Sequence, residues 1–181
     1  MVVDRARRIV GLEGPAELAR SDLLTFEGLF QAEHQALFRA LYLIVGNTQE
    51  AEELMQDAFL KAWERWDRVS RMDNPAGYLC RIAVNGARSR IRRLRLAARR
   101  SIAPPGMQLP DPFADVDLRD ELVRAFAALS ERQRMALVLT DLLDVSAEDS
   151  ARLLRVKPPT VRSLASQGRA ALKVRLGAEH A

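Results

Sequence analysis

The stretch VSAEDSARLLRVKPPTVRSLASQGRAAL, residues 145–172, has the spacing of a helix-turn-helix motif. Ala151 is small at the position where the first helix must let the second one cross closely. Ser146 followed by Asp149 is an N-terminal capping signal for the first helix. Four apolar residues fall at positions that such a helix pair buries: Leu154, Val156, Val161 and Leu164. The stretch therefore predicts two crossed helices, the second of which can enter a DNA major groove.

The second helix of this motif, which begins at Pro158-Pro159, directs polar and basic side chains outward. Arginine can read guanine edges and glutamine can read adenine edges in the major groove. The candidate DNA contacts are Lys157, Pro159, Thr160, Arg162, Ser163 and Gln167. Two positions depart from the common pattern, because Arg155 stands in the turn where glycine is usual and Lys157 replaces a capping Ser or Thr. A left-handed conformation at Arg155 would carry strain.

A second pattern lies at residues 51–66, AEELMQDAFLKAWERW. Its apolar residues recur with helical spacing and form one continuous stripe, made by Ala51, Leu54, Met55, Ala58, Phe59, Ala62, Trp63 and Trp66. Asn47 with Glu50 resembles a capping box, and Gly46 ends the preceding helix. The opposite face is acidic and polar, with Glu52, Glu53, Gln56, Asp57 and Glu64. In an arbitrary helix such a face is more often simply solvated than functional.

A third helix is predicted to open at Asn74-Pro75, since asparagine is a good N-cap and proline suits the first helical position. Four polar or basic residues recur on one face at spacings of four, three and four: Arg81, Asn85, Arg88 and Arg92. No acidic residue occurs between Asn74 and Arg100. Such a face suits a phosphate backbone and exposed bases, and an ordinary solvent face is the alternative.

The charge of the chain is concentrated in one block. The 181 residues carry a formal net charge of +4 and are 48% hydrophobic. Residues 1–87 hold ten basic and 13 acidic side chains, residues 88–100 hold seven arginines and no acid, and residues 101–181 are balanced. A block of this kind marks a polyanion contact, although charge alone fits a solvated helix or linker equally well.

The proline distribution divides the chain. Four of the eight prolines fall between Pro104 and Pro112, where no helix can propagate. Alternating β-branched runs are lacking, so no sheet is expected. We therefore predict an all-α fold of two small helical domains joined by a proline-rich linker. The expected divisions are a flexible segment 1–21, modules 22–98 and 116–176, a linker 99–115 and a tail 177–181.

Several function classes are not expected. The longest uncharged stretches have ten residues, far short of the ~20 that a membrane helix needs, and the first ten residues are too charged for a signal peptide. Cys80 is the sole cysteine, and two distant histidines make no ligand pattern, so no metal or other cofactor is expected. No nucleophile spacing or phosphate-binding glycine loop indicates an enzyme. A cytoplasmic protein is the default expectation.

Taken in order, these motifs resemble those of the extracytoplasmic-function group of the sigma-70 family of RNA polymerase sigma factors. The resemblance runs from about Phe26 to Leu176. It is carried by AEELMQDAFLKAW, by NPAGYLCRIAVNGARSRIRR, and by LSERQRMALVL followed by the helix-turn-helix. It implies that residues 22–98 form sigma region 2, residues 116–176 form sigma region 4, and neither is an enzyme.

The resemblance also implies roles for the candidate residues. Glu52, Glu53, Gln56 and Asp57 match positions that dock on or beside the clamp helices of the largest polymerase subunit, and the flap is a further expected partner. The face made by Arg81, Asn85, Arg88 and Arg92 would capture the non-template strand at the minus-ten element. The helix-turn-helix would read the minus-thirty-five element as duplex. An anti-sigma protein is a possible further partner.

Two other classes of function remain open from the residues alone. A DNA-binding regulator that uses only its helix-turn-helix would bind duplex tightly without polymerase. A helical adaptor that binds only proteins would be indifferent to charge reversal across residues 88–100.

Overall fold

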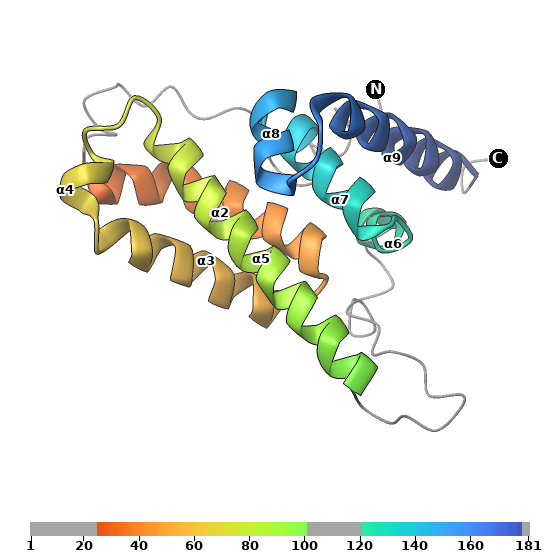
Figure 1. Ribbon diagram of the computed structural model, residues 1–181, viewed down its shortest axis with the longest axis horizontal. Helices are drawn as coiled ribbons and strands as arrows, with labels where there is room; N and C mark the ends of the chain where they lie inside the picture. Colours follow the sequence, from red (N-terminus) through yellow and green to blue (C-terminus); the bar gives the residue numbers. More distant parts are fainter. Residues whose placement is uncertain (1–24, 101–120, 179–181) are drawn as a thin grey trace.

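The computed structural model describes residues 25–100 and 121–178, which form helices joined by short connections and contain no strand. They make two helical bodies that pack against each other (Figure 1). The predicted flexible segment 1–21 and most of the predicted linker 99–115 lie outside these residues. The last helix of the first body runs to Arg100, slightly into that predicted linker.

The first body contains four helices: α2 (Phe26–Val45), α3 (Thr48–Trp63), α4 (Trp66–Val69) and α5 (Pro75–Arg100). Helix α2 ends at Gly46, which has a φ of 77° and donates its N–H to the carbonyl of Tyr42. Asn47 then caps α3, because its Oδ1 accepts the N–H of Glu50 at 2.9 Å. The predicted helix boundary is therefore confirmed, and it turns α3 back along α2.

The core of the first body depends on small residues of α3. Ala51, Ala58 and Ala62 have no exposed surface, so the backbone of α3 approaches α2 and α5 closely. Phe59 is buried between them. The predicted apolar stripe is wrong at Trp63, whose side chain is 53% exposed and packs with only part of its ring against Phe26.

The second body contains α6 (Glu121–Ala127), α7 (Glu131–Leu137), the π-helical turn η2 (Val138–Leu142), α8 (Ala147–Leu154) and α9 (Pro158–Ala178). Ser130 and Gln133 make a reciprocal capping box at the start of α7. The π-helical turn extends α7 with a wider hydrogen-bond spacing, which the sequence periodicity does not predict.

Helices α8 and α9 form the predicted helix-turn-helix. Ser146 caps α8 by accepting the N–H of Asp149 at 3.0 Å, and Ala151 and Val161 are buried where the helices cross. Arg155 adopts the left-handed conformation, with φ 55° and ψ 48°, as the turn requires. The expected strain at this position is therefore present.

Within residues 25–100 and 121–178, no helix combines the length and the hydropathy that a bilayer crossing requires. The buried apolar residues of the two bodies are continuous, because α2 contacts α6, α7 and η2, while α5 contacts α8 (Figure 1).

Candidate nucleic-acid and protein interfaces

The acidic face of α3 is open to solvent. The four side chains that the sequence singles out, Glu52, Glu53, Gln56 and Asp57, are all exposed. Gln49 donates to Glu53 across one helical turn at 3.2 Å. This face can therefore present carboxylates and amides to a partner without any rearrangement of the first body.

Two apolar side chains extend this face toward the end of α3. Leu60 is 55% exposed and Trp63 is 53% exposed. They lie one and two helical turns beyond Gln56, so they adjoin the polar residues. Exposed apolar side chains beside a polar rim are typical of protein interfaces. The helical periodicity placed Trp63 in the core, so the sequence prediction missed this apolar extension of the surface. The one sequence signal for it was Leu60, an apolar residue on the polar face.

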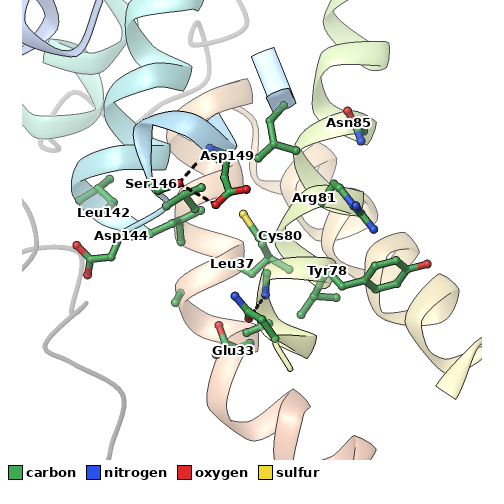
Figure 2. Close-up of a pocket in the computed structure, with 18 of the residues that line it drawn as sticks. Glu33, Leu37, Tyr78, Cys80, Arg81, Asn85, Leu142, Asp144, Ser146 and Asp149 are labelled. Atoms are coloured by element: carbon green, nitrogen blue, oxygen red, sulfur yellow. Dashed lines mark hydrogen bonds between the residues drawn. The ribbon is translucent and has the colours of Figure 1, made fainter. Parts of the chain in front are cut away.

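The four residues of the candidate DNA-binding face of α5 differ in how exposed they are. Arg81, Asn85 and Arg92 are exposed. Figure 2 shows Arg81 and Asn85 on the same side of α5 as Tyr78, and the guanidinium of Arg81 lies 5.1 Å from the centre of the Tyr78 ring. These residues present a cationic surface with an aromatic neighbour, as single-stranded nucleic acid requires.

Arg88, the remaining member of that face, is half-buried against the second body. Its guanidinium donates to the carbonyl of Leu153 at the end of α8. Burial, and then the positive charge of Arg155, hold the pKa of Arg88 below its ordinary value, whereas Glu131 acts in the opposite direction. Arg92 and Arg132 add to the repulsion. The sequence does not predict this contact.

Other arginines of the basic block are also engaged. Arg90 pairs with Glu50 at 2.9 Å, which ties α5 to α3 and raises the pKa of Arg90 through a hydrogen bond and charge. Arg95 pairs with Glu131 of the second body at 2.5 Å. The block is therefore partly a structural element and not a uniformly free cationic surface.

The recognition face of α9 is exposed at all six predicted positions: Lys157, Pro159, Thr160, Arg162, Ser163 and Gln167. Arg162 pairs with Glu148 of α8 at 3.2 Å. Gln167 accepts a hydrogen bond from Gln133 and donates one to Ser163. The side chains therefore share one surface, and contacts within the body engage three of them.

A cleft of about 1080 Å³ lies between α2 and α5 on one side and η2 and α8 on the other. Figure 2 shows Glu33, Cys80 and Asp149 around it. Burial, with a smaller effect of Glu33, raises the pKa of the Cys80 thiol to about 12. Residues 25–100 and 121–178 contain no group of three or more His, Cys, Asp or Glu side chains that could hold a metal ion.

Comparison with known proteins places these features in a family. The family model described as Sigma-70 region 2 matches residues 29–97, and that described as Sigma-70, region 4 matches residues 119–172. The ECF RNA polymerase sigma factor SigM of Mycobacterium tuberculosis is 33% identical over 184 residues, covering 93% of this chain and 90% of that protein. The RNA polymerase sigma-E factor of Streptomyces avermitilis is 27% identical over 164 residues, covering 88% and 89%.

A solved structure agrees with this placement. The sigma factor RpoE of Bartonella quintana, in complex with the anti-sigma factor NepR, has a TM-score of 0.64 and 26% identity, covering 84% of this chain and 96% of that one. The two matched regions and the shared fold define a sigma factor, a protein that directs RNA polymerase to promoters. The chain belongs to the sigma-70 family and to its extracytoplasmic-function group.

This membership decides between the alternatives. A regulator that acts only through its helix-turn-helix does not account for the match to region 2 over residues 29–97. An adaptor that binds only proteins does not account for the match to region 4. The expected all-α fold of two helical domains is confirmed. Proteins of this family are transcription initiation factors.

Proposed function

We propose that this chain binds core RNA polymerase through the exposed face of α3 and reads a promoter with both bodies. The observation that carries the proposal is the presence of two different surfaces on the first body. The exposed acidic residues belong to α3, and the exposed basic residues belong to α5, a different helix. A protein that bound only DNA would have no use for the first surface.

The polymerase-binding surface consists of Glu52, Glu53, Gln56, Asp57, Leu60 and Trp63. The apolar pair supplies contact area that water must leave, and the carboxylates and amide fix the orientation of the partner. A complementary partner surface would be basic with an apolar centre, and the proposed partner is the clamp helices of the largest polymerase subunit. The flap is the proposed partner of the second body.

The minus-ten surface consists of Arg81, Asn85, Arg88 and Arg92. Promoter opening requires a base to leave the stack, which costs a few kcal/mol. Arginines on the phosphates and the amide of Asn85 on an exposed base offset that cost. Arg88 contributes to this surface once its bond to Leu153 is released.

The minus-thirty-five surface consists of Lys157, Pro159, Thr160, Arg162, Ser163 and Gln167. Arg162 and Gln167 carry the side chains that can make bidentate contacts with bases. The remaining residues lie just before or near the start of α9, where they would contact backbone phosphates. In this proposal residues 22–98 and 116–176 are the functional units, residues 99–115 join them, and segments 1–21 and 177–181 have no assigned role.

We further infer that the protein acts in the cytoplasm, where its polymerase is, and that it has no catalytic activity of its own. An anti-sigma protein is a proposed partner. The described residues of the proposed surfaces include no arrangement of side chains that would make or break covalent bonds. Each proposed role is therefore one of binding or positioning.

Run-off transcription with core polymerase, promoter DNA and this chain tests the proposal. Wild type should give transcripts from defined start sites. Gln56→Ala with Asp57→Ala should lower the affinity for core polymerase at least about tenfold, because two central polar contacts are lost. Arg162→Ala should reduce transcription only from templates that contain the upstream element.

Glu27→Ala, an exposed acid on α2, is the matched control for the α3 variant, and it should retain wild-type affinity. Failure of the wild-type chain to select start sites on core polymerase would reject the proposed function. Unchanged core affinity in the α3 double variant would reject only the assignment of that surface.

A further inference from the structure

Two glutamines from different helices of the second body are joined by a hydrogen bond. Nε2 of Gln133, on α7, donates to Oε1 of Gln167, on α9, at 3.3 Å. Gly168 lies in the contact between these helices, since a Cβ there would be 3.6 Å from the backbone oxygen of Gln133. Gly168 is buried, Gln133 is half-buried and Gln167 is exposed. The bond therefore links the interior of the second body to the recognition face of α9.

The capping box at the start of α7 fixes which way the amide of Gln133 points. Its Oε1 accepts the backbone N–H of Ser130 at 3.1 Å and the hydroxyl of Ser130 at 2.9 Å. A backbone N–H can only donate, so the oxygen of Gln133 must face Ser130. The NH2 group of the same amide then lies on the other side, toward α9.

This orientation passes from Gln133 to Gln167. Because Gln133 presents an N–H, the atom of Gln167 that faces it is the oxygen. The amide nitrogen of Gln167 lies on the side of Ser163 and donates to its hydroxyl oxygen at 3.3 Å. A free glutamine amide can turn by roughly 180° and exchange its donor and acceptor. The bonds that start at the cap favour one of these two orientations.

A fixed amide discriminates between bases better than one that turns. Gln167 keeps one N–H and one oxygen lone pair after these two bonds, because an amide offers two donors and two acceptor sites. A donor beside an acceptor matches N7 and N6 of adenine in the major groove. The reverse orientation would place a donor opposite the 6-position, where guanine carries an acceptor oxygen. Fixing the amide therefore separates the two purines.

We propose that Gln133 is a positioning residue for promoter recognition, which fixes the amide of Gln167 in the orientation that selects an adenine in the minus-thirty-five element. The inference rests on the proposed DNA role of Gln167. Gln133 acts through Gln167 and has no need to touch DNA itself. A residue of α7, outside the helix-turn-helix, is thereby added to those that determine which sequence is read.

Two substitutions of Gln133 separate positioning from capping. Gln133→Glu keeps the acceptor that caps α7 but has no N–H for Gln167, and its carboxylate would attract the NH2 group of Gln167 instead. Gln133→Lys supplies a donor to Oε1 of Gln167 but cannot accept from Ser130. Positioning predicts that the lysine variant retains the adenine preference and the glutamate variant loses it. A purely structural role of the cap predicts the reverse.

Run-off transcription with core polymerase and the full-length chain measures this preference. The template is the promoter whose start site the wild-type chain selects, with each base pair of its upstream element changed in turn. Gln167→Ala identifies the position that Gln167 reads, where the wild type should prefer adenine. Gln133→Glu and Gln133→Leu should lower the ratio of transcription with adenine to transcription with guanine there by about two- to tenfold, since one neutral hydrogen bond is lost. Preferences at the other positions should stay unchanged.

Gln35→Leu, which changes an exposed glutamine of α2, is the matched control and should keep the wild-type preference at every position. Gln133→Leu combined with Gln167→Ala should match Gln167→Ala alone, because the effect passes through Gln167. A uniform fall in transcription from all templates would show only a loss of stability or affinity and would overturn the inference.

Three further results would overturn the inference and leave the proposed function in place. The first is an unchanged adenine preference in Gln133→Leu. The second is a preference that Gln133→Lys loses and Gln133→Glu retains, which would assign Gln133 to the cap alone. The third is an unchanged preference at every position in Gln167→Ala. The proposed function itself fails on a different observation, the absence of defined start sites with the wild-type chain.

Discussion

Arg155 occupies a backbone conformation that favours glycine, in the turn between α8 and α9. A non-glycine residue in the left-handed region costs roughly 1–2 kcal/mol. Arg155 also lies close enough to Arg88 to lower its pKa. This one residue therefore adds both backbone strain and charge repulsion to the folded chain.

Arg155→Gly should raise the free energy of unfolding by about 0.5–1 kcal/mol, because the relief of strain exceeds the extra freedom of glycine in the unfolded chain. Thermal unfolding followed by circular dichroism measures the change. Arg155→Ala is the control, since it removes the same charge and keeps the left-handed strain. Equal stability of the glycine and alanine variants would contradict a contribution from backbone strain.

The Cys80 thiol should stay unreactive well above neutral pH. Its pKa of about 12 in the folded chain keeps the nucleophilic thiolate scarce. Because the folded pKa is raised above the unfolded value of roughly 8.5, the thiol favours folding below that pH and loses this contribution as the pH approaches 12. Reaction with a colorimetric disulfide reagent from pH 7 to 10 measures the thiolate, with the chain in denaturant as the control. Equal reaction rates in the folded and denatured chains would contradict the burial of the Cys80 thiol.

Single residues also mark the limit of what sequence predicts. The left-handed strain at Arg155 follows from the spacing of the turn, so it was predictable. The partner of Arg88 was not, because the carbonyl of Leu153 comes from a helix 65 positions away. Trp63 fits the helical period but lies at the last residue of α3, where Phe26 of α2 covers only part of its side chain.

At the scale of elements, the capping residues at helix ends fix where the helices begin and contribute to stability. Asn47→Ala should lower the free energy of unfolding by about 1 kcal/mol, because the N–H of Glu50 loses the side-chain oxygen that accepts it. Chemical denaturation of the full chain measures this loss. Asn47→Ser retains an acceptor and should cost less than half as much. If the serine and alanine variants are equally destabilised, the cap contributes nothing.

The elements that sequence predicts well are those with both a cap and a continuous apolar stripe. Helix α3 has both, and its predicted start at Asn47 agrees with the structure. The helix-turn-helix is predicted in the same way by Ser146 and by the buried pair Ala151 and Val161. The π-helical turn η2 has no such signature, because one extra residue in a turn leaves the composition of the helix unchanged.

At the scale of the whole molecule, the ion pair between Arg95 and Glu131 joins the two bodies. Glu131→Arg should lower the free energy of unfolding by about 1 kcal/mol or less, because it replaces this partly exposed ion pair with a repulsion. Chemical denaturation of the full chain measures the change. The charge swap Glu131→Arg with Arg95→Glu should restore most of the wild-type stability, and equal stability of the single variant and the wild type would contradict a contribution from the pair.

The relation between the two bodies was the least predictable feature. Proline content and charge indicate two helical units, but the contact of Val84 with Leu139 and Leu153 joins parts of the chain that local patterns treat separately. The periodicity of α5 predicts that its apolar side belongs to the core of the first body. The same pattern cannot show that the second body also buries part of it.

The π-helical turn η2 places Asp141 where Arg169 of α9 reaches both of its carboxylate oxygens, at 2.9 and 3.0 Å. A turn of this kind equals an α-helix with one residue inserted. Removing one residue would rotate everything downstream by roughly 100° about the helix axis. The aspartate would then swing away from its arginine, so the length of this segment is as constrained as its composition, and a deletion here should be tolerated far less well than a substitution.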